Sequence, residues 1–165
     1  NFFTPVCKVF FSHERRGRRG KPFKIYKFQT MKNSTPNCAT NELENPEQYI
    51  TGFGKILRKT SLDELPQLWN ILKGDMSFVG PRPLISSEIR AHRLRLEYGV
   101  YRFRPGLTGW AQINGRDDIS IMKKMKLDKE YCDNWSIGLD LKILFKSVEV
   151  CIKQEGFHEG KIHRR

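Results

Sequence analysis

A chain of 165 residues, 38% hydrophobic and 29% charged, has the length and composition of one folded domain and not of a disordered segment. Its 30 lysines and arginines against 18 acidic residues give a formal net charge of +12, which favours an anionic partner: nucleic acid, an anionic membrane surface or a phosphorylated small molecule. The cysteines form no Cys-x-x-Cys pair and the histidines are scattered, which argues against a zinc ribbon, a transition-metal cluster and a disulfide framework. The longest uncharged stretch, 105–115, is too short to span a bilayer.

The start of the chain has the pattern of a β-hairpin. Residues 6–11 and 23–31 are rich in β-branched and aromatic side chains, which is typical of strands. The segment between them, 13–21, is basic and contains glycine, so a long, positively charged tip is predicted. Residues 33–46 are rich in Asn, Thr and Pro, have no apolar period and are predicted to form a loop.

Most of the remaining chain has apolar residues at helical spacing. Irregular segments rich in Gly and Pro interrupt this spacing at 74–83 and 104–116. The predicted fold class is therefore α+β, a mostly helical single domain with a short N-terminal β-hairpin. Helices are predicted from about residue 49 and over 62–72, 84–98, 120–134 and 139–154.

On two of these helices, the spacing of the residues along the chain does not by itself decide whether certain side chains are buried or exposed. The helix predicted over 84–98 places Arg90, Arg93 and Arg95 on its polar faces. The last helix has an apolar stripe that covers either the core or a membrane, and the core is favoured. The stripe consists of Leu141, Leu144, Phe145, Val148 and Ile152.

The central segment RKTSLDELPQLWNILKGDMSFVGPRPL, residues 58–84, is chemically the most informative. Ser61 and Glu64 have the spacing of a capping box, in which each side chain bonds the other residue's backbone N–H, and this purely structural interpretation accounts for both. Pro66 disagrees with it, because a proline two residues after Glu64 distorts the start of a helix. At a distorted terminus the neighbouring carboxylates of Asp63 and Glu64 can face one site.

Arginines flank this pair of carboxylates. Arg58 lies upstream, and Arg82 stands between two prolines that restrict its backbone and help to hold its guanidinium for a phosphate. Two carboxylates beside arginines at a helix N-terminus suit a metal-assisted phosphoryl site.

Four blocks of the sequence follow in order over nearly the whole chain: FFSHERRGRRGKPFKIYKFQTM, RKTSLDELPQLWNILKGDMSFVGPRPL, YRFRPGLTGWAQINGR and NWSIGLDLKILF. Together they resemble the bacterial sugar transferase family, the monotopic polyprenyl-phosphate phosphoglycosyl transferases or undecaprenyl-phosphate sugar phosphotransferases. The resemblance implies a catalytic domain over 1–155, a basic C-terminal tail over 156–165 and a membrane-inserted helix upstream of residue 1.

The resemblance implies a covalent mechanism. Asp63 attacks the β-phosphate of a UDP-sugar, releases UMP and carries the sugar phosphate until a polyprenyl phosphate accepts it. Glu64 positions Mg²⁺ or handles a proton. Asp63 and Glu64 are the expected Mg²⁺ ligands, and Asp128 is a weaker candidate.

Contacts to the phosphates and the nucleotide sugar are likewise implied. The chain departs from the family at Gln29, where arginine is usual, which puts an anion contact at that position in doubt. The residues that the resemblance places at the substrate are Arg58, Arg82, Arg104, Arg116, Lys27 and Gln112.

The implied partners are a UDP-sugar, a polyprenyl phosphate and the anionic surface of the bacterial inner membrane, on whose cytoplasmic face the domain is expected, with an oligomer possible and no nucleic acid. Two alternatives stay open. A basic nucleic-acid-binding domain is supported by the charge and by the aromatic and basic residues of YRFRPGLTGW, but leaves Asp63, Glu64 and Arg82 unexplained. The other is a catalytically silent scaffold of the same fold.

Overall fold

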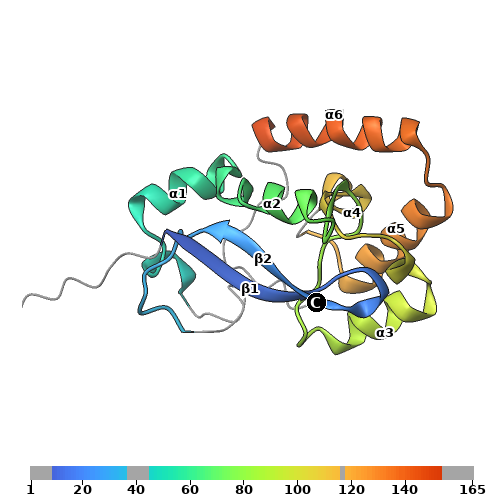
Figure 1. The fold of residues 1–165 in the computed structure, drawn as a ribbon. Helices are drawn as coiled ribbons and strands as arrows, with labels where there is room; N and C mark the ends of the chain where they lie inside the picture. Colours follow the sequence, from blue (N-terminus) through green and yellow to red (C-terminus); the bar gives the residue numbers. More distant parts are fainter. Residues whose placement is uncertain (1–8, 37–44, 116–117, 154–165) are drawn as a thin grey trace, which may run out of the picture.

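The computed structural model describes residues 9–36, 45–115 and 118–153 (Figure 1). Within these ranges, six α-helices are combined with an antiparallel hairpin and a short parallel strand pair, which confirms the α+β class. The predicted basic tail, 156–165, lies outside the described residues. The helices are α1 (Gly52–Lys59), α2 (Gln67–Leu72), α3 (Ile89–Glu97), α4 (Trp110–Ile113), α5 (Ile121–Asp133) and α6 (Ile137–Lys153).

The ladder of the N-terminal hairpin extends further towards its tip than the sequence pattern predicted, whereas its second strand ends at Phe28 and not at 31. Residues 6–8 of the first predicted strand lie outside the described residues. Strands β1 (Phe10–Arg16) and β2 (Pro22–Phe28) pair antiparallel along their whole length. Residues 13–16 therefore belong to β1, and the tip is reduced to a turn in which the Gly17 N–H donates to the Lys21 carbonyl at 2.8 Å. The ladder continues through this charged segment because the opposite strand is anchored in the core by the buried Ile25, which faces His13.

The helix predicted over 62–72 is broken at Pro66. A 3-10 turn, Leu62–Glu64, comes first, and α2 begins only at Gln67. Proline lacks the N–H that a continuous helix would use, so the distortion expected at this residue is confirmed. The turn contacts both α1 and β2, and α2 packs on β2.

A parallel strand pair lies where the sequence predicted irregular structure. Strand β3 (Ser77–Val79) pairs with β4 (Gly106–Thr108), with Val79 opposite Thr108. The backbones come very close beyond the pair: a Cβ on Gly106 would lie 2.1 Å from the Gly80 nitrogen. Glycine at these positions therefore permits close strand packing, and local composition alone could not distinguish this from a loop.

The core lies between α5, α6 and the parallel pair, and includes Val79, Tyr131 and the fully buried Ile143. Beside it, Arg95 of α3 donates to Asp128 of α5 at 2.6 Å, and both side chains are 3% exposed. The prediction that Arg95 lies on a polar face is wrong, because a buried carboxylate from α5 compensates its charge.

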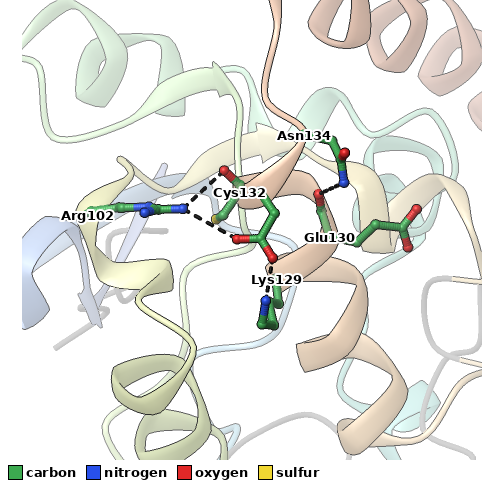
Figure 2. Close-up of polar contacts among 6 residues, drawn as sticks. Arg102, Lys129, Glu130, Cys132 and Asn134 are labelled. Carbon is green, nitrogen blue, oxygen red and sulfur yellow. Dashed lines mark hydrogen bonds and ion pairs between the residues drawn. The ribbon is translucent and has the colours of Figure 1, made fainter.

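A polar cluster fixes the end of α5 against the short 3-10 helix Val100–Arg102 (Figure 2). Arg102 Nη2 donates to the Cys132 carbonyl at 3.2 Å and approaches Asp133 Oδ1 at 3.5 Å. Lys129 pairs with the other oxygen of the same carboxylate. This cluster ties α5 to the segment that leads into β4.

Helix α6 packs on α4, β3 and β4, and lies across the top of Figure 1. It contributes Ile143 and Val150 to the core, whereas its predicted stripe faces outward: Phe145 is 77% and Ile152 is 76% exposed. The favoured assignment of the stripe to the core is wrong, because the buried residues follow a neighbouring face of the helix. Within the described ranges, no helix has the length and apolar character needed to cross a membrane.

Candidate active site

Asp63 and Glu64 lie on the 3-10 turn between α1 and α2. Ser61, just before them, has φ 56° and ψ 15°, a left-handed conformation that is uncommon for residues other than glycine. Its side chain makes no capping bond, and the Glu64 N–H donates instead to the Ser61 carbonyl at 3.2 Å. The capping-box interpretation is therefore wrong, and the Glu64 carboxylate has another partner.

That partner is Lys27 on β2, whose Nζ donates to Glu64 Oε1 at 2.5 Å. The buried Asn70 of α2 holds the strand in place, since its Nδ2 donates to the Lys24 carbonyl at 2.7 Å and its Oδ1 accepts from the Tyr26 N–H at 3.2 Å. These bonds fix β2 against α2 and so place Lys27 opposite the turn.

Asp63 is almost fully buried, with 8% of its surface exposed. Burial raises the pKa of its carboxyl above the usual value, Lys27 and Arg58 oppose this rise, and the neighbouring Glu64 adds to it. A carboxylate is nucleophilic only in its ionised form, so Lys27 and Arg58 favour the reactive state of Asp63 whereas burial opposes it.

A small pocket of about 260 Å³, including the space at its mouth, opens beside this turn. Lys27 and Glu64 line it together with Arg82 from the segment after β3. Gln67 and Leu107 complete its walls with Ile25, Pro83 and Arg15. The pocket thus gathers three cations and one carboxylate from elements far apart in the sequence.

Arg15, on β1, lines this pocket but was not among the residues predicted from the sequence. It was assigned to the hairpin tip, whereas the extended β1 turns its side chain into the pocket. The period-two alternation of a strand is the signal that could have found it, but the charged residues of 12–16 obscure that alternation.

The sequence model of a family described as "Bacterial sugar transferase" matches residues 3–154. The chain belongs to the bacterial sugar transferase family. The resemblance inferred from the four sequence blocks is thereby confirmed.

Relatives within the bacterial sugar transferases support this assignment. The chain is 46% identical over 154 residues to "Uncharacterized sugar transferase EpsL" of Bacillus subtilis, covering 92% of this chain and 73% of that protein. It is 41% identical over 147 residues to "UDP-glucose:undecaprenyl-phosphate glucose-1-phosphate transferase" of Escherichia coli, covering 85% and 32%. For "Undecaprenyl-phosphate galactose phosphotransferase" of Salmonella typhimurium the identity is 38% over 161 residues, with 88% and 34% covered. The chain thus spans about a third of the length of these last two proteins.

The other predicted site residues of this bacterial sugar transferase differ in how the structure places them relative to Asp63 and the pocket. Arg58 acts electrostatically on Asp63 and Arg82 lines the pocket. Arg104 is exposed and lies near Gly74, from whose position a Cβ would be 3.8 Å from Arg104 Nη2. Gln112 is not among the residues that line the pocket, but its Nε2 donates a 3.3 Å hydrogen bond to the carbonyl of Leu107, which is.

Two more assignments concern arginines of the family pattern. Arg116 lies outside the described residues. Gln29, which stands where the family usually has arginine, donates from Nε2 to the Met31 carbonyl at 2.6 Å. The glutamine therefore holds the backbone at the end of β2.

The carboxylates fit a magnesium ion with few protein ligands. In the part of the chain that the structure describes, no group of three or more Asp, Glu, His or Cys side chains could hold a metal. Mg²⁺ commonly takes one or two carboxylates and fills its other positions with water and phosphate oxygens. Asp63 and Glu64 match that donor set, whereas Asp128 is occupied by Arg95.

Proposed function

We propose that this protein transfers a sugar-1-phosphate from a UDP-sugar to undecaprenyl phosphate, which begins the synthesis of a lipid-linked glycan. The observation that carries the proposal is the buried Asp63, whose neighbour Glu64 lines a pocket together with arginine and lysine. A carboxylate that attacks phosphorus needs cations to hold an anionic phosphate next to it. The relatives from E. coli and S. typhimurium are named for this class of transfer.

The reaction takes two steps at one phosphorus atom. A carboxylate oxygen of Asp63 attacks the β-phosphorus of the UDP-sugar; the new O–P bond forms as the bond to the bridging oxygen breaks, and that oxygen leaves with UMP. A phosphate oxygen of undecaprenyl phosphate then attacks the same phosphorus and returns the electron pair to Asp63. Both nucleophiles are anions, so neither step requires the removal of a proton.

The neighbouring side chains assist this exchange by position and charge. Lys27 holds Glu64 and, with Arg58, favours the ionised form of Asp63 that attacks. Arg82 in the pocket binds phosphate oxygens of the substrate. Asp63 and Glu64 would hold Mg²⁺, which when bound screens the repulsion between the carboxylate and the diphosphate.

The protein also binds an anionic membrane surface, the cytoplasmic face of the inner membrane, where a soluble UDP-sugar can meet a lipid phosphate. The net charge of +12 favours such a surface. Large apolar side chains are exposed on α1, α2 and α6, all in the upper part of Figure 1. They include Phe53, Ile56, Leu68, Trp69, Leu72, Phe145 and Ile152.

The test is UMP release by the full chain in detergent with undecaprenyl phosphate, Mg²⁺ and a panel of UDP-sugars. Asp63→Asn should lower the rate by about a thousandfold or more, because an amide does not replace the nucleophile. Asp133→Asn, which removes an exposed carboxylate of α5, is the matched control and should stay within about twofold of the parent. UMP release by Asp63→Asn at the parental rate would contradict the proposal.

A further inference from the structure

Two adjacent arginines of β1 line different cavities. Arg15 lines the pocket that contains Lys27 and Glu64. Arg16 lines a second cavity, formed with Arg95 and Tyr101. Successive side chains of a strand point to opposite faces, so the pairing of β1 with β2 directs only Arg15 to the reaction site.

The guanidinium of Arg15 shares its pocket with a second cation, Arg82, and the two positive charges repel each other. Burial, and after it the positive charge of Arg82, lowers the pKa of Arg15 to about 10, so the side chain remains charged at neutral pH. Glu64 and Glu88 counter this effect only in part. Each of these two carboxylates has a bond elsewhere: Glu64 accepts from Lys27, and Glu88 Oε2 accepts from the Ile85 N–H at 2.8 Å.

Arg15 also has an unused donor. Its Nε is buried and has no hydrogen-bond partner among the residues that the structure describes. No ion pair joins Arg15 to a carboxylate within the same ranges. A buried donor without a partner, in a pocket that holds two guanidinium groups, is costly unless an anion occupies that pocket.

We propose that Arg15 binds the phosphate oxygens of the substrate together with Arg82, as a substrate-binding residue of the transfer reaction. This inference rests on the proposed function and extends it to a residue of the N-terminal hairpin. Two planar guanidinium groups from different elements can each donate a pair of hydrogen bonds to one diphosphate. The hairpin would therefore be part of the phosphate-binding site as well as a structural unit.

The test measures binding of inorganic pyrophosphate to the full chain by calorimetry, together with the KM for the UDP-sugar in UMP release. Arg15→Gln should weaken pyrophosphate binding and raise KM by about tenfold or more, as expected for the loss of a charge-assisted hydrogen bond. Arg19→Gln is the matched control, because Arg19 is an exposed arginine at the tip of the same hairpin, and it should change both quantities by less than about twofold.

Thermal unfolding separates this role from a purely structural one. If Arg15 binds anions, Arg15→Gln relieves the repulsion from Arg82, so the Tm without ligand should stay the same or rise while pyrophosphate affinity falls. A lower Tm with parental pyrophosphate affinity would overturn the inference, as would equal affinities of Arg15→Gln and Arg19→Gln. If the proposed function is wrong, UMP release will not depend on Asp63. The pyrophosphate measurement does not depend on that result and would still decide whether Arg15 binds an anion.

Discussion

Asp63 combines two properties that oppose each other in most carboxylates: it is buried, and the proposed mechanism requires it to be charged. Burial raises the pKa of its carboxyl above the ordinary value of 3.8, and Lys27 is the foremost of the groups that limit the rise. Lys27 and Arg58 therefore favour the ionised form of a carboxylate that burial disfavours.

This balance predicts a pH dependence. Because the folded-state pKa is raised, the attacking carboxylate is lost as the pH falls through a value above 3.8. Lys27→Gln removes a positive charge that favours the carboxylate, so the acid limb of single-turnover UMP release should move to higher pH. An acid limb that stays in place or moves to lower pH would contradict the role given to Lys27.

Ser61 makes the turn that presents Asp63, and it does so in a left-handed conformation with φ 56°. A β-branched side chain is strongly disfavoured there, whereas glycine adopts this conformation at little cost. Ser61→Val should lower the free energy of unfolding by about 2 kcal/mol, and Ser61→Gly should leave it unchanged or raise it slightly. Urea unfolding measures both variants, and equal losses in the two would show that the conformation carries no strain.

For individual residues, the sequence indicated the carboxylate pair but not all of the side chains that surround it. Asp63 and Glu64 could be singled out because they are adjacent and lie just before Pro66, which is local information, and their roles stay a prediction from the family resemblance. Arg15 was missed because its place in the pocket depends on how far the hairpin ladder extends. The Lys27–Glu64 contact joins residues 37 positions apart, and only the resemblance to the family suggested Lys27.

Helices α3 and α5 are joined by a buried ion pair, Arg95 with Asp128, and not by apolar contacts alone. Asp128→Asn would leave the Arg95 charge buried without compensation and should cost about 3–5 kcal/mol of stability. The double change Arg95→Met with Asp128→Leu should recover most of that loss.

Thermal unfolding of these variants measures the changes in stability. For Asp128→Asn, repeating it with and without Mg²⁺ separates a structural role of Asp128 from its weak assignment as a metal ligand. The fall in Tm of Asp128→Asn should be the same with and without Mg²⁺. A variant with the parental Tm in the absence of the ion, and a smaller stabilisation by Mg²⁺, would instead make Asp128 a metal ligand.

Elements with strong local periodicity were predicted well, as the agreement for α5 and α6 shows. The parallel pair β3–β4 was missed because it joins 77–79 with 106–108, and a pairing over that separation leaves no pattern in either segment. The break at Pro66 was predicted because proline acts locally on the backbone.

On the scale of the whole molecule, the main feature is the outward apolar face of α6. Its spacing predicted an apolar stripe, but periodicity does not say whether other elements cover the stripe. The core is completed by Ile143 and Val150 from the same helix, so none of the described residues buries the stripe and it is available to a binding partner.

Vesicle sedimentation tests whether that partner is a membrane. The double variant Phe145→Ser with Ile152→Ser should bind phosphatidylglycerol-containing vesicles about tenfold or more weakly than the parent, because it removes two exposed apolar side chains of α6. Ile89→Ser is the control, since Ile89 is 69% exposed on α3, at the opposite edge of Figure 1. Equal loss in both variants, or in neither, would contradict a membrane role for this face.

The most direct test of a covalent route through Asp63 is the intact mass of the full chain after reaction with a UDP-sugar and Mg²⁺ in the absence of undecaprenyl phosphate. We expect an added mass of one sugar phosphate on the parent, none on Asp63→Asn, and loss of the adduct when undecaprenyl phosphate is supplied. An adduct on Asp63→Asn, or UMP release by the parent with no adduct at any time, would contradict a covalent route through Asp63.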